Sequence, residues 1–217
     1  GVNVTIPHKE AVLALCDEVD GIARRIGAAN FLQFRDGRIL ASNTDAFGFK
    51  ENLKATAAAF DAARAPAVLL GAGGGARAVA VGLLDAGVPE LRLCNRNRDR
   101  AERLARDIGG AITVLPWDAR KDALSGAGLL VNSTSLGMEG QPALDLELED
   151  LDPAAVVCDL VYSPLETELL AAARSRGCSV VDGLGMLLHQ GRACFAAWYG
   201  PDPAVTPALR AFVLGAD

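Results

Sequence analysis

The sequence predicts an α/β fold in two parts: a doubly wound parallel sheet with helices on both faces, and a smaller α/β domain before it. From residue 67 onward, short continuous apolar runs alternate with helical patterns, as in strands that are buried on both faces of a sheet. Before residue 67, Asp36-Gly37 lies between two strand-like runs and is a hairpin signal, which a purely parallel sheet does not contain. The length of 217 residues allows one large domain or two small ones.

The composition excludes several classes of protein. Hydrophobic residues make up 51% of the chain and charged residues 22%, as in an ordinary globular protein. The net charge is −6 and no run of Lys or Arg occurs, so we expect no nucleic-acid partner. No apolar run reaches the roughly 18 residues of a membrane span, and two histidines are too few for a zinc site. Five cysteines without a C-x-x-C pair favour the reducing cytoplasm.

The residues before position 67 predict the smaller domain and the segment that leaves it. We expect a strand over residues 2–6, a helix over 9–19, strands over 29–34 and 38–42, and a helix from 44 to about 60. Because the chain opens inside a strand-like run, we also expect that further residues precede Gly1 in the whole protein.

The remaining residues predict the parallel sheet and its helices. Strands are expected over 67–70, 91–94, 112–115, 128–131, 156–160 and 179–181, and helices over 76–86, 101–108, 165–176, 186–198 and 207–214. The acidic stretch 139–152 also carries leucines, so it is expected to form a solvated loop with one apolar side.

A glycine-rich loop lies between the expected strand over 67–70 and the helix that follows. Gly71-Ala72-Gly73-Gly74-Gly75-Ala76 contains the pattern G-x-G-x-x-G/A. Gly71 permits a tight turn, Gly73 lets the backbone approach a pyrophosphate, and Ala76 allows close packing of helix on strand. The free N–H groups at the helix N-terminus then favour phosphate. This loop predicts dinucleotide binding by a Rossmann-type domain, and a merely structural turn is the alternative.

The end of the next strand indicates which dinucleotide binds. An NAD site has Asp or Glu there, which accepts a hydrogen bond from the ribose 2′-hydroxyl. Here the chain has Asn95, Arg96 and, four residues further on, Arg100. Guanidinium groups suit a 2′-phosphate in charge and geometry. The sequence therefore predicts NADP, and a solvated basic start of a helix is the alternative.

Three short motifs in the first part of the chain each put polar groups at the end of an expected strand. They are Asn3-Val4-Thr5-Ile6-Pro7-His8-Lys9, Gly27-Ala28-Ala29-Asn30 and Asn43-Thr44-Asp45. Open α/β folds place ligands at such strand ends. Lys9 and Asp45 are a plausible pair for proton transfer, because a carboxylate can hold and orient an ammonium group. Taken singly, each motif has a structural explanation, such as Asn43 or Thr44 capping the next helix.

With these motifs in order, the sequence resembles the shikimate dehydrogenase family, which includes the quinate/shikimate dehydrogenases. The motifs N-V-T-I-P-H-K, G-A-A-N, N-T-D, G-A-G-G-G-A-R-A, N-S-T-S-L-G-M, D-L-V-Y-S-P and D-G-L-G-M-L-L-H-Q-G extend from Asn3 to Gly191. The resemblance implies reversible reduction of 3-dehydroshikimate to shikimate with NADPH, a step of chorismate and aromatic amino acid biosynthesis. It also implies a substrate-binding domain over 1–45, an NADP-binding domain over 46–184, and C-terminal helices over 185–217 that return to the first domain.

The resemblance implies a role for each motif residue. Lys9 and Asp45 would be the catalytic pair, and substrate would also be bound by Thr5, Asn30, Tyr162 and Gln190. NADP would be bound by Gly71, Ala72, Gly73, Gly74, Gly75, Asn95, Arg96, Arg100, Thr134, Leu160, Gly183 and Met186. The family also carries an N-terminal S-x-S loop for the substrate carboxylate, which this sequence does not contain.

Several alternatives stay open at this point. A quinate/shikimate dehydrogenase that uses NAD is the nearest one, although Arg96 and Arg100 argue against NAD. A catalytically silent protein that binds NADP is a more distant one. The methylene-folate class of two-domain dehydrogenases is disfavoured because the sequence contains no Y-x-x-x-K. The expected partner is a small polyhydroxylated acid, and both a monomer and a homodimer are compatible with the sequence.

Overall fold

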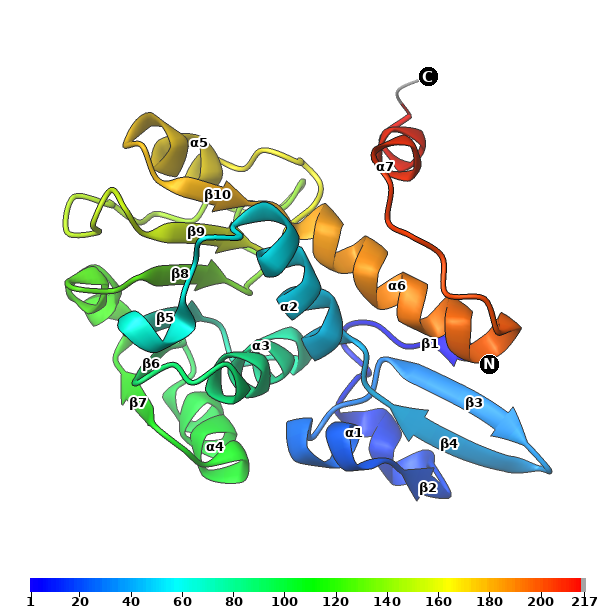
Figure 1. Cartoon of the computed structure of the whole chain (residues 1–217). Helices are drawn as coiled ribbons and strands as arrows, with labels where there is room; N and C mark the ends of the chain where they lie inside the picture. Colours follow the sequence, from blue (N-terminus) through cyan, green and yellow to red (C-terminus); the bar gives the residue numbers. More distant parts are fainter. Residues whose placement is uncertain (216–217) are drawn as a thin grey trace.

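The computed structural model of the protein describes residues 1–215 and contains two sheets (Figure 1). The small sheet has the strand order β1-β3-β4-β2, and the large sheet has the order β10-β9-β8-β5-β6-β7. All neighbouring strands of the large sheet are parallel. The small sheet is mixed, because β2 is parallel to β4 while the other pairs are antiparallel. The predicted α/β fold class is confirmed.

The elements follow one another along the chain in two groups. The small sheet comprises β1 (Val2–Asn3), β2 (Glu18–Val19), β3 (Phe31–Arg35) and β4 (Arg38–Ser42), with the 3₁₀ helix η1 (Ala11–Leu15) and α1 (Gly21–Ile26). The large sheet comprises β5 (Ala67–Leu70), β6 (Leu91–Cys94), β7 (Ile112–Leu115), β8 (Leu129–Asn132), β9 (Val156–Asp159) and β10 (Ser179–Val181). The other helices are α2 (Asp45–Thr56), η2 (Ala62–Arg64), α3 (Gly74–Asp85), α4 (Arg98–Ile108), η3 (Trp117–Arg120), η4 (Asp122–Leu124), α5 (Glu168–Ser175), α6 (Gly183–Tyr199) and α7 (Pro207–Val213).

The predicted hairpin is confirmed by β3 and β4. Phe31 pairs with Ser42 and Arg35 with Arg38, and the turn between them is Asp36-Gly37. Both turn residues have positive φ, 50° at Asp36 and 75° at Gly37. This is the conformation that a two-residue hairpin turn requires.

The prediction of a helix over residues 9–19 is wrong. Ala11–Leu15 forms one short 3₁₀ helix, and Glu18–Val19 forms β2. The backbone N–H of Asp17 donates to the Ile39 carbonyl, and the Asp17 carboxylate accepts from the Ile39 N–H at 2.7 Å. Pairing with β4 therefore replaces the helical hydrogen bonds, although the apolar side chains of this segment still pack into a core.

Two further features at the N-terminus differ from the prediction. The strand expected over 2–6 is limited to Val2–Asn3, because the chain turns after Val4 and the His8 N–H donates to the Thr5 carbonyl. Helix α1 was not expected at all. Its signal is Asp20, whose carboxylate accepts from the Ala23 N–H at 2.7 Å and caps the helix.

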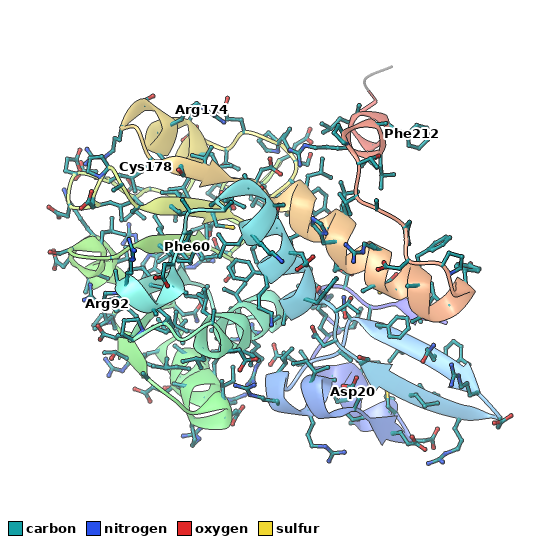
Figure 2. The ribbon with its side chains drawn as sticks, viewed as in Figure 1. Asp20, Phe60, Arg92, Arg174, Cys178 and Phe212 are labelled. Atoms are coloured by element: carbon teal, nitrogen blue, oxygen red, sulfur yellow. The ribbon has the colours of Figure 1, made fainter. Side chains whose placement is uncertain are left out.

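The two faces of the large sheet are covered differently, as in a doubly wound fold (Figure 2). On one face, Leu69, Leu93 and Val131 pack under α2, α3 and α4. On the other face, Val68, Leu130 and the neighbouring strand residues pack under α5, η4 and the segment 144–151. Leu144, Leu148 and Leu151 are buried there, so the acidic stretch has the expected apolar side.

Helices α2 and α6 run side by side between the two sheets (Figure 1). Gly48 of α2 lies against α6 so closely that a Cβ atom there would be 2.7 Å from the Met186 carbonyl oxygen and 2.9 Å from the Gln190 nitrogen. At its other end α6 reaches the small sheet, where the rings of Phe31 and Trp198 are 5.2 Å apart. These two helices therefore set how the sheets sit relative to one another.

The order of the large sheet reverses between β5 and β8, and the loops after these strands meet at that point. The Ser133 N–H and hydroxyl both donate to the Leu70 carbonyl. Gly71 has φ of 107°, and a Cβ atom there would be 2.6 Å from the Ser133 hydroxyl oxygen. A side chain cannot be accommodated at Gly71, and a crevice at this reversal is where open α/β sheets bind ligands.

Residues 1–215 contain no helix whose length and hydropathy would let it cross a bilayer. In the same residues, no group of three or more His, Cys, Asp or Glu side chains is arranged to hold a metal ion. The five cysteines are free thiols, and four of them are buried. Burial raises the pKa of the Cys94 thiol to about 11, which keeps it protonated and unreactive at neutral pH.

We predict that Gly48→Ala lowers the free energy of unfolding by about 1–3 kcal/mol, because the added methyl group must push α6 away from α2. Gly191→Ala is the matched control in α6, since a Cβ atom there meets nothing within 4 Å. It should raise the free energy of unfolding by about 0.5–1 kcal/mol through helix propensity. Urea unfolding of both variants measures these free energies. An equal change in the free energy of unfolding for Gly48→Ala and Gly191→Ala would contradict a tight contact between α2 and α6 at Gly48.

Candidate active site

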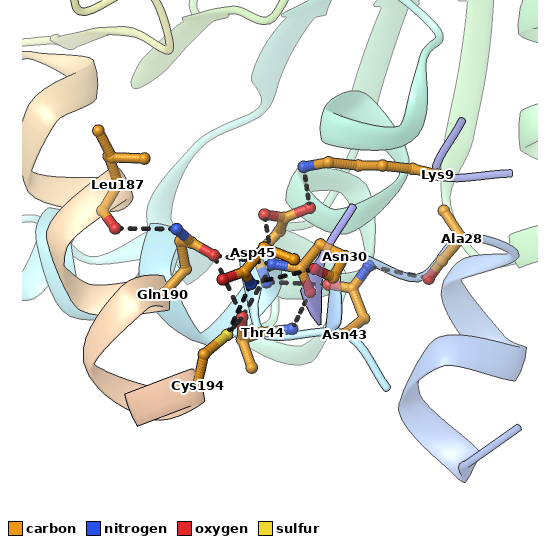
Figure 3. A network of polar contacts seen from close by, with 10 residues as sticks. Lys9, Ala28, Asn30, Asn43, Thr44, Asp45, Leu187, Gln190 and Cys194 are labelled. Atoms are coloured by element: carbon orange, nitrogen blue, oxygen red, sulfur yellow. Dashed lines mark hydrogen bonds and ion pairs between the residues drawn. The ribbon is translucent and has the colours of Figure 1, made fainter. Parts of the chain in front are cut away.

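A cluster of polar side chains lies where the small sheet, α2 and α6 meet (Figure 3). Lys9 follows β1, Asn30 immediately precedes β3, and Asp45 is the first residue of α2. Gln190 comes from α6, far along the chain. The close packing of α2 on α6 brings Gln190 to the other three, so four of the predicted site residues lie together.

The Asp45 carboxylate is held by two donors. The Lys9 ammonium donates to Oδ2 at 2.6 Å, and Asn30 Nδ2 donates to Oδ1 at 3.0 Å. The Asp45 side chain is 4% exposed, whereas the Lys9 side chain is 18% exposed. The position of Asp45 in the first turn of α2 also favours its negative charge. The pair therefore has a fixed carboxylate and an ammonium group that a ligand can reach.

Asn30 connects the pair to the rest of the cluster. Its Nδ2 lies 2.9 Å from both the Thr44 hydroxyl oxygen and Gln190 Oε1, and its Oδ1 accepts from the Thr44 N–H at 2.7 Å. Gln190 in turn donates through Nε2 to the Leu187 carbonyl. Asn30 is 2% exposed, so these bonds hold it in one orientation.

Sequence reasoning did not assign site roles to Asn43, Thr44 and Cys194. Asn43 is buried, its Oδ1 accepts from the Asp45 N–H at 2.9 Å, and its Nδ2 donates to the Ala28 carbonyl at 2.8 Å. Thr44 Oγ1 lies 3.3 Å from the buried Cys194 sulfur. The signal for Asn43 and Thr44 was their place in N-T-D beside Asp45. Cys194 had no signal, because only the path of α6 brings it here.

Two predicted substrate ligands are not joined to this cluster. Thr5 is exposed, and within residues 1–215 its side chain makes no hydrogen bond to the cluster. Tyr162 is 51% exposed in the turn after β9. Their proposed contacts with substrate stay predictions.

The glycine-rich loop forms the turn from β5 into α3. Five other α-helices of the described chain have a side chain that accepts a first-turn N–H, namely Asp20, Asn97, Thr167, Asp182 and Thr206. In α3 the N-cap residue is Gly73, and no side chain caps it. The first-turn N–H groups of α3 are therefore left for a ligand, and they favour an anion.

The polar cluster and the glycine-rich loop are contiguous. A Cβ atom at Gly74 would be 3.0 Å from Lys9 Cβ and 3.3 Å from Lys9 Cδ. The stem of Lys9 thus lies directly against the N-terminus of α3 while its ammonium binds Asp45. A ligand held at the glycine-rich loop would be next to the Lys9–Asp45 pair.

The basic residues after β6 are accessible. Asn95 donates to the Asn97 carbonyl at 2.7 Å and so shapes the loop, while Arg96 and Arg100 are exposed. Arg100 Nη2 lies 3.9 Å from where a Cβ atom of Gly73 would be. No acidic residue occupies the end of β6. This donor set suits a phosphate group beside the glycine-rich loop.

The remaining predicted cofactor ligands surround the other side of the crevice. The Thr134 methyl group would be 3.2 Å from a Cβ atom at Gly71, and Leu160 Cδ1 would be 3.6 Å from one at Gly75. Gly183 packs against the Leu160 carbonyl, where a Cβ atom would clash with the backbone. Met186 is 8% exposed and packs in the core below this turn.

A buried hydrogen-bond network that sequence reasoning missed supports this side of the crevice. Asp159 is fully buried at the end of β9 and accepts from Asn132 Nδ2, the Thr167 hydroxyl and the Val161 N–H at 2.8–3.0 Å. Burial raises the pKa of the Asp159 carboxyl, and these hydrogen bonds act against that rise. The network fixes the turn that contains Leu160.

Comparisons with known proteins agree with this arrangement. The family model described as "Shikimate dehydrogenase substrate binding domain" matches residues 1–32, and the one described as "Shikimate / quinate 5-dehydrogenase" matches residues 54–139. A protein of Paramagnetospirillum magneticum named shikimate dehydrogenase (NADP(+)) is 55% identical over 215 residues, which cover 99% of this chain and 78% of that protein.

Two solved structures also show the fold. A quinate dehydrogenase from Corynebacterium glutamicum in complex with NAD has a TM-score of 0.89 and 34% identity, covering 98% of this chain and 77% of that one. A shikimate 5-dehydrogenase from Thermus thermophilus in complex with NADP(H) and shikimate has a TM-score of 0.81 and 41% identity, covering 94% of this chain and 74% of that one. On this evidence, the chain belongs to the shikimate dehydrogenase family.

Proposed function

We propose that the protein is an NADP-dependent shikimate dehydrogenase, which reversibly reduces the ring carbonyl of 3-dehydroshikimate to the hydroxyl of shikimate. The observation that carries this proposal is the Lys9–Asp45 pair at 2.6 Å, which lies against the N-terminus of α3. The names of close relatives support the same substrate and cofactor.

The residues at the crevice fit NADP. A Cβ atom at Gly73 would meet only Arg100 Nη2, at 3.9 Å, so the backbone there is open to a ligand, and the first turn of α3 has no side-chain cap. Arg96 and Arg100 supply the cationic donors that a 2′-phosphate requires. Gly71–Gly75 would hold the pyrophosphate, Asn95 would be at the adenosine ribose, and Thr134, Leu160, Gly183 and Met186 would be on the nicotinamide side.

In the proposed reaction, the bound nicotinamide supplies or accepts the hydride. Lys9 acts at the oxygen of the reacting carbon. In the direction of reduction its ammonium donates a hydrogen bond to the carbonyl oxygen and then the proton that makes the hydroxyl. Asp45 holds the ammonium in place and stabilises its positive charge. In the reverse direction the same amine takes the proton back.

A polyhydroxylated ring needs several hydrogen-bonding side chains. Asn30, Asp45 and Gln190 already form one network, which presents an amide, a carboxylate and a second amide. Thr5 and Tyr162 are further candidate ligands. A site of this kind rejects analogues that lack a hydroxyl, because its buried polar groups would lose their partners.

The division of the chain into a substrate-binding part over 1–45, an NADP-binding part over 46–184 and returning helices over 185–217 is part of this proposal. The two sheets and the path of α6 support it. Cytoplasmic location is also a proposal, supported by the free thiols of the described chain.

Quinate/shikimate dehydrogenase is the second candidate function. It is favoured by the likeness to the quinate dehydrogenase solved with NAD. Arg96 and Arg100 and the absence of an acid at the end of β6 favour NADP instead.

We predict that Lys9→Met lowers kcat by about 10²–10⁴-fold, because the ammonium is lost while the aliphatic stem against α3 is kept. The dissociation constant of NADP should stay unchanged. Lys54→Met, an exposed lysine of α2, is the control and should behave as the unsubstituted protein. Stopped-flow and steady-state assays measure the rates, and turnover that survives Lys9→Met would contradict the role of Lys9.

We predict that Arg96→Ala and Arg100→Ala each raise the KM for NADPH at least about tenfold, because each removes a charge-assisted hydrogen bond to the 2′-phosphate. The KM for NADH should change little. Arg98→Ala is the matched control in the same segment, since the Arg98 side chain pairs with Glu102 at 2.7 Å. An equal rise in the KM for NADPH and in the KM for NADH would mean that Arg96 and Arg100 do not bind the 2′-phosphate.

We predict that kcat/KM is highest for shikimate with NADP among the four pairs of shikimate or quinate with NADP or NAD. The arginines after β6 set the cofactor preference, and the network around Asn30 sets the substrate preference. Steady-state oxidation of both acids with both cofactors measures this. A preference for quinate with NAD would support the second candidate function.

A further inference from the structure

Glu10 connects the two parts of the molecule at the edge of the crevice. It follows Lys9 in sequence, and its Oε1 accepts from Arg100 Nη2 at 2.6 Å. Arg100 lies in α4, beside the large sheet, so this ion pair spans the gap between the parts. The Arg100 side chain is 52% exposed and the Glu10 side chain 35% exposed, so a dissolved ligand can reach the pair.

Glu10 also faces a second guanidinium group. Arg77 is 4% exposed, and its Nη1 and Nη2 donate to the Ile26 carbonyl and the Asp107 carboxylate. Its buried Nε has no hydrogen-bond partner in the described chain, and Glu10 Oε2 lies 3.6 Å from it. The Glu10 carboxylate thus lies between a fixed, buried arginine and an accessible one.

A cleft of about 440 Å³ opens at this ion pair. It is lined by Pro7, Glu10 and Ala11 on one side and by Asn97, Asp99, Arg100 and Arg103 on the other. The two arginines suit an anion, whereas Glu10 and Asp99 place negative charges in the same space. An anion that binds Arg100 must therefore share or displace its contact with Glu10.

We propose that Glu10 is a specificity-determining residue, whose carboxylate competes with the 2′-phosphate of NADP for the Arg100 guanidinium. This inference rests on the proposed function, since it requires that NADP is the cofactor. Competition lowers the affinity for a 2′-phosphate and leaves the affinity for a 2′-hydroxyl nearly unchanged. Glu10 therefore moderates the preference for NADP over NAD that Arg96 and Arg100 create.

Arg77 lowers the cost of this exchange of partners. When Arg100 turns to a phosphate, the Glu10 carboxylate retains the unpartnered Nε of Arg77 beside it. Neither anion is then left without a cation beside it.

Binding of two fragments to the full chain tests this inference. Adenosine 2′,5′-bisphosphate carries the 2′-phosphate and adenosine 5′-monophosphate lacks it. By isothermal titration calorimetry, Glu10→Gln should tighten binding of the bisphosphate about three- to tenfold, because an exposed ion pair and a nearby like charge are worth little more. Binding of the monophosphate should stay the same. In an Arg100→Ala background, Glu10→Gln should change the constant for the bisphosphate less than it does with Arg100 present, and the constant for the monophosphate not at all.

Glu18→Gln is the matched control, because it removes the same charge from the same part of the chain and from an ion pair of the same length, 2.6 Å to Arg38. It should change neither constant. Unchanged or weaker binding of the bisphosphate in Glu10→Gln overturns the inference. If the unsubstituted protein binds the bisphosphate no more tightly than the monophosphate, the NADP assignment itself is wrong.

Discussion

The close contact between α2 and α6 is the constraint on which the site depends. Gly48 brings the helix axes near enough that Gln190 of α6 reaches Asn30, while Asp45 at the start of α2 faces Lys9. Each helix begins beside one sheet and ends beside the other, so the same contact also sets the width of the crevice. The packing of Gly48 against α6 therefore also places the polar residues of the site, and a change in the spacing of α2 and α6 would alter both.

The carboxylate is the fixed member of the Lys9–Asp45 pair, and the ammonium is the accessible one. Asp45 is almost fully buried, begins a helix and accepts from Asn30, which is itself held by Thr44. Such a carboxylate needs no rearrangement when the charge on its partner changes, which is the condition for electrostatic preorganisation. Lys9 contacts α3 through its stem, so its position depends on the glycine-rich loop as well as on the carboxylate.

The sequence predicted the large sheet well because its strands are buried on both faces and their apolar runs are unambiguous. It failed over residues 9–19, where the apolar spacing suited a helix but Glu18–Val19 pairs with β4 instead. The short helix α1 escaped notice because only Asp20 marks it. In the site, Lys9, Asn30 and Asp45 were visible as strand-end polar residues. Cys194 and Glu10 were not, because the residues they contact lie more than sixty positions away along the chain.

A chain with a net charge of −6 that binds a polyanionic cofactor has to separate its charges in space. In physiological salt, screening limits the range over which each charge acts to about 8–10 Å. The charged groups close to a bound ligand therefore matter more than the net charge of the chain. Around the glycine-rich loop that set is cationic, with the uncapped turn of α3 and the arginines after β6. The acidic stretch 139–152, by contrast, packs over the opposite face of the large sheet. Glu10 and Asp99 are acids inside this region, and the position of Glu10 between Arg77 and Arg100 is why we assign Glu10 a role in cofactor choice.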